Sequence, residues 1–147
     1  REAGLVRGAY HFYNPNSDPI RQADFFISQV KLEKGDLAPV LDIERKPRGK
    51  AQLQADLVKF LNRLEQHYGV KPIIYTSYKY MTRYLDTPEF AQYPLWIAHY
   101  YVDTLSYEGA WQFWQHTDYG TVPGIDESVD LNVFNGSLDG LQRYTLK

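Results

Sequence analysis

The chain has 147 residues, of which 44% are hydrophobic and 23% are charged, a composition typical of one globular domain and not of a disordered segment. Its net charge of -2 gives no basic excess for nucleic-acid binding, and its apolar runs are too short for a membrane span. The absence of cysteine excludes disulfides and thiol chemistry.

The first predicted elements are a strand and a helix. Residues 5–13 form a largely apolar run with His11 near its end, and His11 is either a site residue or a hydrogen-bonded structural one. Asp18 followed by Pro19 predicts the start of a helix, and apolar residues then recur at helical spacing up to Gly35.

Two acids close the next predicted strand. The apolar run 37–41 indicates a buried strand, and Asp42 and Glu44 follow it directly. Side chains alternate along a strand at about 3.3 Å per residue, so these acids share one side with backbones roughly 6.6 Å apart. Such a pair suits cooperating carboxylates, although the acids could also enter solvent or pair with the basic residues that follow.

Strands and helices then alternate. Residues 50–68 carry an apolar stripe at helical spacing that Gly69 ends. The later predictions are a strand over 71–75, a helix capped by 76–77 that runs to about 85, and strands over 95–98, 111–116 and 128–134. This order favours a parallel α/β sheet or barrel, whose chemistry lies at the carboxyl ends of the strands. That rule selects, at one rim, His11, Asp42, Glu44, Tyr75, Trp96, Gln115 and Asp130.

Aromatic residues are unusually frequent. The chain contains 13 Tyr, 7 Phe and 3 Trp, together 16% of its residues. Tyr and Trp carry polar tips that are costly to bury unpaired, so an excess of them indicates a binding groove, and sugar rings with one apolar face suit such a groove.

Six short motifs extend over nearly the whole chain. They are Gly8–Phe12, Leu41–Glu44, Ile74–Thr76, Leu95–Ala98, Trp114–Gln115, and Val122–Ile125 followed by Val129–Asn132. Each motif is weak alone, but in this order they resemble the family-25 glycoside hydrolases, the Chalaropsis-type lysozymes. The resemblance implies a single domain over 1–147, an irregular TIM-like (β/α) barrel of the α/β class. It also implies cleavage of the β-1,4 bond between N-acetylmuramic acid and N-acetylglucosamine in peptidoglycan.

The resemblance also implies residue roles. Glu44 matches the general acid, which later acts as base, Asp42 matches its companion acid, and Asp130 matches a further acid at the rim. The substrate-binding candidates are His11, Tyr75, Trp96, Tyr100 and Gln115. Burial and the neighbouring anions are expected to keep Glu44 protonated near neutral pH. Asp42 is expected to orient the N-acetyl group of the substrate or to assist water, and we favour substrate assistance over direct nucleophilic attack.

One departure from the family pattern lies at the start. The family opens with a Gly-Ile-Asp-Val-Ser-like strand and a second strand with an Ile-Lys-Ala-Thr-like segment, and neither is present. The chain begins at Arg1 without an initiator Met or a signal peptide. We therefore expect an amino-terminally incomplete domain with exposed pairing edges and one site carboxylate fewer.

The expected partners follow from this reading. They are glycan strands of peptidoglycan, with no nucleic acid and no membrane, for a monomer whose exposed edges could promote association. The expected location is secreted, cell-wall associated, periplasmic or phage-delivered. We expect no cofactor or metal, because no His-Glu-x-x-His spacing occurs, and a metal cluster of His11, Asp42 and Glu44 is the alternative.

Two other functions remain open. A chitinase-like N-acetylhexosaminidase also uses an Asp-x-Glu strand end with substrate assistance. A non-catalytic cell-wall carbohydrate-binding remnant would keep the aromatic groove without the chemistry.

Overall fold

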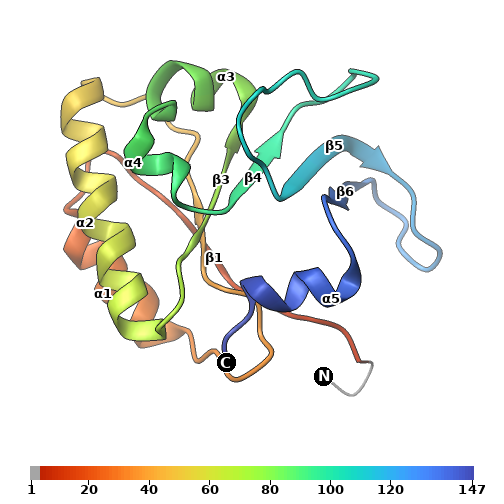
Figure 1. Cartoon of the computed structure of the whole chain (residues 1–147), viewed down its shortest axis with the longest axis horizontal. Coiled ribbons are helices and arrows are strands. Elements are labelled where there is room, and N and C mark those ends of the chain that lie inside the picture. Colours follow the sequence, from red (N-terminus) through yellow and green to blue (C-terminus); the bar gives the residue numbers. More distant parts are fainter. Residues whose placement is uncertain (1–3) are drawn as a thin grey trace.

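The computed structural model describes residues 4–147 and contains one six-stranded sheet in the order β1-β2-β3-β4-β5-β6 (Figure 1). The strands are β1 (Tyr10–Phe12), β2 (Val40–Asp42), β3 (Ile73–Ser77), β4 (Leu95–Ala98), β5 (Phe113–Gly120) and β6 (Val129–Phe134). Neighbours from β1 to β5 are parallel, and β6 returns antiparallel to β5. The chain start at Arg1 lies outside the described residues.

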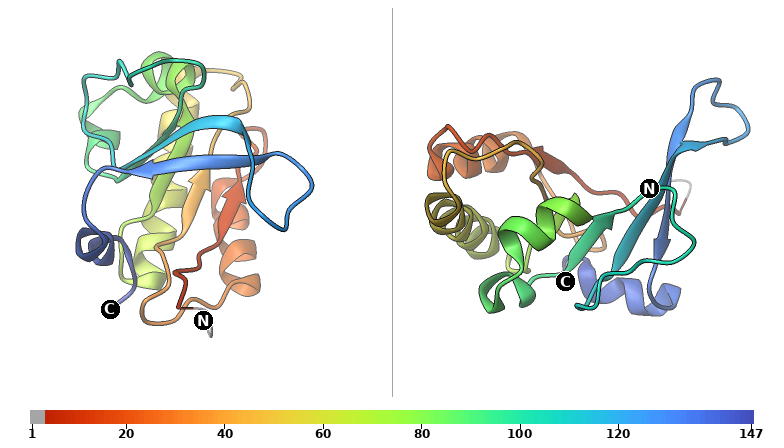
Figure 2. Two further views of the ribbon diagram at one scale, coloured as in Figure 1. Left: turned by 90° about the vertical axis from the view of Figure 1, so that its right-hand side faces the viewer. Right: turned by 90° about the horizontal axis from the view of Figure 1, so that it is seen from above.

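Most of the helices connect strands, and the last two follow β6. The helices are α1 (Pro19–Gln29), α2 (Lys50–Tyr68), α3 (Tyr78–Tyr80), the π-helix η1 (Met81–Leu85), α4 (Pro88–Ala91), α5 (Leu138–Leu141) and the 3-10 helix η2 (Gln142–Tyr144). In Figure 2, α1 and α2 lie on one side of the sheet and the β5–β6 hairpin projects away from them. The predicted α/β class is confirmed. Within residues 4–147 the sheet is open and curved, with β1 and β6 at its two edges.

Local signals explain the two long helices. The Asp18 carboxylate accepts a hydrogen bond from the backbone N–H of Arg21 at 2.8 Å and caps α1. This helix ends at Gln29, short of the predicted limit at Gly35. Helix α2 spans 50–68 as predicted and ends at Gly69, whose φ of 69° lies in the left-handed region.

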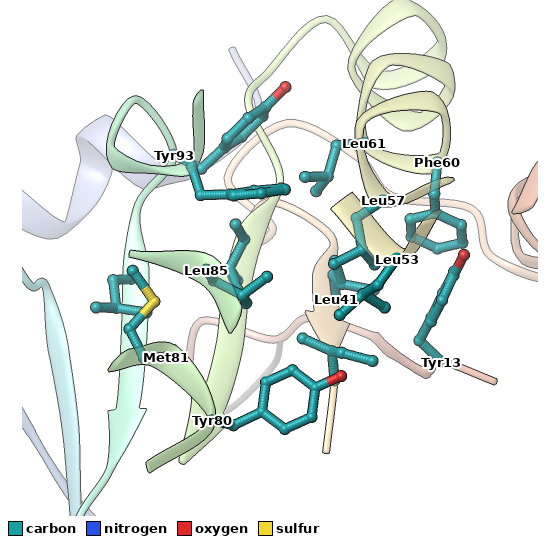
Figure 3. Close-up of a cluster of buried hydrophobic side chains, with 14 of the residues drawn as sticks. Tyr13, Leu41, Leu53, Leu57, Phe60, Leu61, Tyr80, Met81, Leu85 and Tyr93 are labelled. Carbon is teal, nitrogen blue, oxygen red and sulfur yellow. The ribbon is translucent and has the colours of Figure 1, made fainter. Parts of the chain in front are cut away.

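The main core lies between the sheet and the helices that cover one of its faces, which are α1, α2, α3, η1 and α4 (Figure 3). Leu57, Phe60 and Leu61 of α2 are fully buried, and they belong to one cluster with Leu41 of β2 and Ile74 of β3. The predicted stripe of α2 is therefore the face that packs on the sheet. No helix in residues 4–147 is long and apolar enough to cross a membrane.

A smaller core covers part of the opposite, concave face. Val40, Ile73 and Phe113 stand at the amino-terminal ends of their strands and are packed against Phe134 and Tyr144. This cluster covers part of the amino-terminal end of the concave face.

Candidate active site

A cavity of about 570 Å³ opens on the concave face and extends from the segment before β1 and the start of β2 to the carboxyl ends of the parallel strands. Six of the eight sequence candidates line it: Asp42, Glu44, Tyr75, Trp96, Gln115 and Asp130. The volume falls within the roughly 300–1,000 Å³ typical of small-ligand sites.

Strand register explains why the candidates of the first strands meet. Asp42 pairs with Tyr75, and Tyr75 pairs with Trp96, so the three side chains form one row across β2, β3 and β4. Because side chains alternate, Glu44 points to the same side as Asp42, two residues beyond the end of β2.

Asp130 reaches the cavity by a different route. It is the second residue of β6, and β6 runs antiparallel to β5. The start of β6 therefore lies beside the carboxyl ends of the parallel strands. For this reason Asp130, near the start of β6, lines the same cavity as Asp42 and Glu44, which lie at and beyond the end of β2.

The ionisation of Asp42 is strongly perturbed. Its Oδ1 atom is buried and has no hydrogen-bond partner among residues 4–147. Loss of hydration, and then the charge of Glu44, raise the pKa of Asp42 to about 7. The expected burial of Glu44 is wrong, because its side chain is exposed.

Gln115 holds two tyrosine hydroxyls. This side chain is buried, and its Oε1 atom accepts hydrogen bonds from the hydroxyl of Tyr75, at 2.7 Å, and from the hydroxyl of Tyr100. Burial, followed by the closeness of the Tyr100 hydroxyl, raises the pKa of Tyr75 above its ordinary value. Since each hydroxyl donates its proton to Gln115, its oxygen remains as an acceptor for a ligand N–H or O–H.

Asn132 holds the neighbouring wall of the cavity. Its Oδ1 atom accepts a hydrogen bond of 2.8 Å from the indole N–H of Trp96. The Trp96 ring also contacts Tyr75 edge-on, with centroids 6.0 Å apart, and Phe113 at 5.0 Å. Asn132 was not among the sequence candidates, although alternation along β6 places it on the same face as Asp130.

His11 does not join the cavity. It pairs with Leu41, which is buried beneath the helices, and its ring is stacked with Phe60 at a centroid distance of 5.3 Å. Its Nε2 atom lies 3.1 Å from Oε1 of Gln22. This is the hydrogen-bonded structural role, so the structure does not support His11 as a substrate contact.

The alternative metal cluster fails for the same reason. His11 lies on the opposite face of the sheet from Asp42 and Glu44. In the described part of the chain, no group of three or more His, Asp and Glu side chains could hold a metal ion.

The chain resembles known proteins in both sequence and structure. The family model described as glycosyl hydrolases family 25 matches residues 1–125. The uncharacterized protein YegX of Escherichia coli strain K12 is 41% identical over 146 residues, covering 98% of this chain and 53% of YegX. Lysozyme M1 of Streptomyces globisporus is 33% identical over 151 residues, covering 92% of this chain and 51% of the lysozyme.

A solved structure of the same family has a similar fold. The structure of a family 25 glycosyl hydrolase from Bacillus anthracis matches with a TM-score of 0.87 at 31% identity, covering 99% of this chain and 71% of that one. The chain spans about half the length of the curated relatives it matches.

Proposed function

Because the chain belongs to family 25 of the glycosyl hydrolases, we propose that it hydrolyses the β-1,4 bond between N-acetylmuramic acid and N-acetylglucosamine in peptidoglycan. The observation that carries this proposal is the pair Asp42 and Glu44 in one cavity walled by Tyr75 and Trp96. The lysozyme name of the Streptomyces globisporus relative supports it.

Glu44 is the proposed general acid. Hydrolysis of a glycosidic bond requires a proton on the leaving oxygen as positive charge develops at the anomeric carbon. Glu44 lines the cavity, where it donates this proton and afterwards takes one from the attacking water.

Asp42 is the proposed partner of the N-acetyl group. In substrate assistance, the acetamido carbonyl oxygen attacks the anomeric carbon, and positive charge develops on the acetamido N–H. An ionised Asp42 accepts the hydrogen bond from this N–H and stabilises the charge. The Asp42 pKa of about 7 leaves the carboxyl able to change its protonation state near neutral pH.

The aromatic wall positions the sugar. Trp96 offers a ring held by Asn132, against which the apolar face of a pyranose packs. The hydroxyl oxygens of Tyr75 and Tyr100 accept hydrogen bonds from the sugar, because their protons are engaged with Gln115. Asp130 adds a third carboxylate at the rim.

One observation favours a second candidate, the binding of wall glycan without turnover. Glu44 is exposed, whereas a glycosidase general acid usually lies in an apolar environment. Under either function the partner is a peptidoglycan glycan strand, so the proposed place of action is the cell wall.

The test is a turbidity assay on purified cell walls with analysis of the new reducing ends. Glu44→Gln is expected to lower kcat at least about 100-fold while the protein still binds walls, because only the transferable proton is lost. Glu89→Gln, on the exposed start of α4, is the matched control and should keep full turnover.

The reducing ends separate the candidates. Muramic acid at the new ends supports the proposal, and cleavage of chitin oligomers instead of walls supports the chitinase-like alternative. Wall binding by both forms without clearing supports the binding function, and full turnover by Glu44→Gln contradicts the assignment of the acid.

A further inference from the structure

A second cavity, of about 560 Å³, lies on the other side of β5 from the candidate active site. It is lined by Tyr101, Val102, Asp103, Trp114, His116, Thr117 and Val133, none of which lines the first cavity. Alternation along β5 explains the separation, since Gln115 faces one cavity while Trp114 and His116 face the other.

Tyr101 has an unusual backbone at this cavity. Its φ of 59° makes it the only non-glycine residue in residues 4–147 with a positive φ. Bulky side chains rarely adopt this left-handed conformation, and such outliers persist where the surroundings impose them, often at binding sites. Burial does not account for the conformation, because Tyr101 is 80% exposed.

Two contacts hold the Tyr101 ring in place. Its hydroxyl donates a hydrogen bond of 3.1 Å to Oδ1 of Asp118 on β5. Its ring meets Tyr100 edge-on, with centroids 6.2 Å apart at 72°. Tyr100 in turn binds Gln115 of the candidate active site, so Tyr101 is an oriented, solvent-exposed ring directly beside that site.

We propose that Tyr101 and this second cavity form a distal sugar-binding subsite for the glycan strand held in the active site. The exposed ring offers a face for the apolar side of a pyranose, and Asp103, His116 and Thr117 line the cavity with groups that can bind sugar hydroxyls. The strand would pass from the first cavity over Tyr100 to Tyr101. This inference rests on the proposed function, because it takes the same glycan as ligand.

The test measures binding as a function of glycan length, in the Glu44→Gln protein so that the ligand is not consumed. The probes are a disaccharide, which fills only the active site, and soluble peptidoglycan strands of eight or more sugars. Tyr101→Gly removes the ring, and glycine adopts the observed φ without strain. The expected result is a Kd for the long strands that rises about five- to tenfold, with less than a twofold change for the disaccharide.

Two further variants sharpen the result. Tyr101→Phe keeps the ring and loses only the bond to Asp118, so its Kd for long strands should lie between those of the parent and Tyr101→Gly. Phe25→Ser removes another exposed aromatic side chain, on α1, and should change neither Kd. Thermal unfolding of each variant checks that the fold is retained.

The outcomes distinguish this inference from the proposed function. If Tyr101→Gly binds the disaccharide and the long strands with the same Kd values as the parent Glu44→Gln protein, the distal subsite is overturned and the proposed function still stands. If Tyr101→Gly loses affinity for the long strands only, and the unmodified protein does not hydrolyse walls, the subsite is supported and the hydrolase proposal is overturned. Failure of the parent to bind either glycan overturns both.

Discussion

At Asp42 the fold disfavours the charged carboxylate that the proposed mechanism uses. One carboxylate oxygen is buried without a hydrogen-bond partner in the described part of the chain, and the pKa rises to about 7. The unfolded value is near 3.8, so between about pH 4 and 7 the folded protein binds more protons than the unfolded chain. The contribution of Asp42 to the free energy of unfolding therefore decreases as the pH rises through this window.

Asp42→Asn should consequently stabilise the protein at high pH. At pH 8 we expect a free energy of unfolding about 1 to 2 kcal/mol higher, less than the full pKa shift would give because the carboxyl keeps some contact with water. The gain should shrink toward zero as the pH falls to about 4, where the carboxyl is protonated in both states. Urea unfolding at several pH values measures it. Asp126→Asn, at an exposed site, is the control, and a less stable Asp42→Asn at pH 8 would contradict the interpretation.

At the scale of the element, helix α2 is flanked by a glycine at each end, and the two glycines have different backbone conformations. Gly49, at the N-cap, has an extended φ of -161° and provides no side-chain cap. Gly69, at the C-cap, has a left-handed φ of 69°. Neither Cβ position has another atom within 4 Å, so backbone conformation and capping decide what a side chain does there.

The two ends should therefore respond in opposite directions to substitution. Gly49→Asp is expected to raise the free energy of unfolding by about 0.5 to 1 kcal/mol, through a new cap, a favourable charge at the helix start and a less flexible unfolded chain. Gly69→Ala is expected to lower it by about 1 kcal/mol, because alanine is strained at this φ. Urea unfolding at neutral pH measures both, and destabilisation by Gly49→Asp would show that this end of α2 does not accept a cap.

At the scale of the whole molecule, the sheet has two edges within residues 4–147. Strand β1 pairs only with β2, and β6 pairs only with β5. Beside the β1 edge, Tyr10 is 68% exposed and Phe12 is 43% exposed. An unprotected edge with apolar side chains is a template for pairing with another chain.

We expect this 147-residue chain, studied by itself, to be monomeric when dilute and to self-associate through the β1 edge when concentrated. Tyr10→Lys should reduce this association, because a charged side chain at an edge opposes pairing. Sedimentation velocity over a range of concentrations measures it. Leu138→Lys, on α5 and 85% exposed in the parent, is the control for added charge alone, and equal effects of the two substitutions would locate the association elsewhere.

Features that depend on neighbouring residues could be predicted from the sequence. The limits of α2 follow from an apolar stripe and a terminal glycine, and both signals are local. Alternation along a strand was enough to place Asp42 and Glu44 on one side. The rule that chemistry gathers at the carboxyl ends of strands then selected seven side chains, six of which line the cavity.

Features that depend on distant pairing were decided only by the tertiary structure. Periodicity shows which residues share a face, but not which face the helices cover, so His11 was assigned to the site although its ring packs against Phe60. Asp130 reaches the cavity because β6 is antiparallel, and strand direction depends on the pairing partner. Burial of Asp42 and exposure of Glu44 likewise depend on how β2 lies in the sheet. The sequence by itself determined the residue types and their local spacing, whereas packing between distant segments decided their solvation and their neighbours.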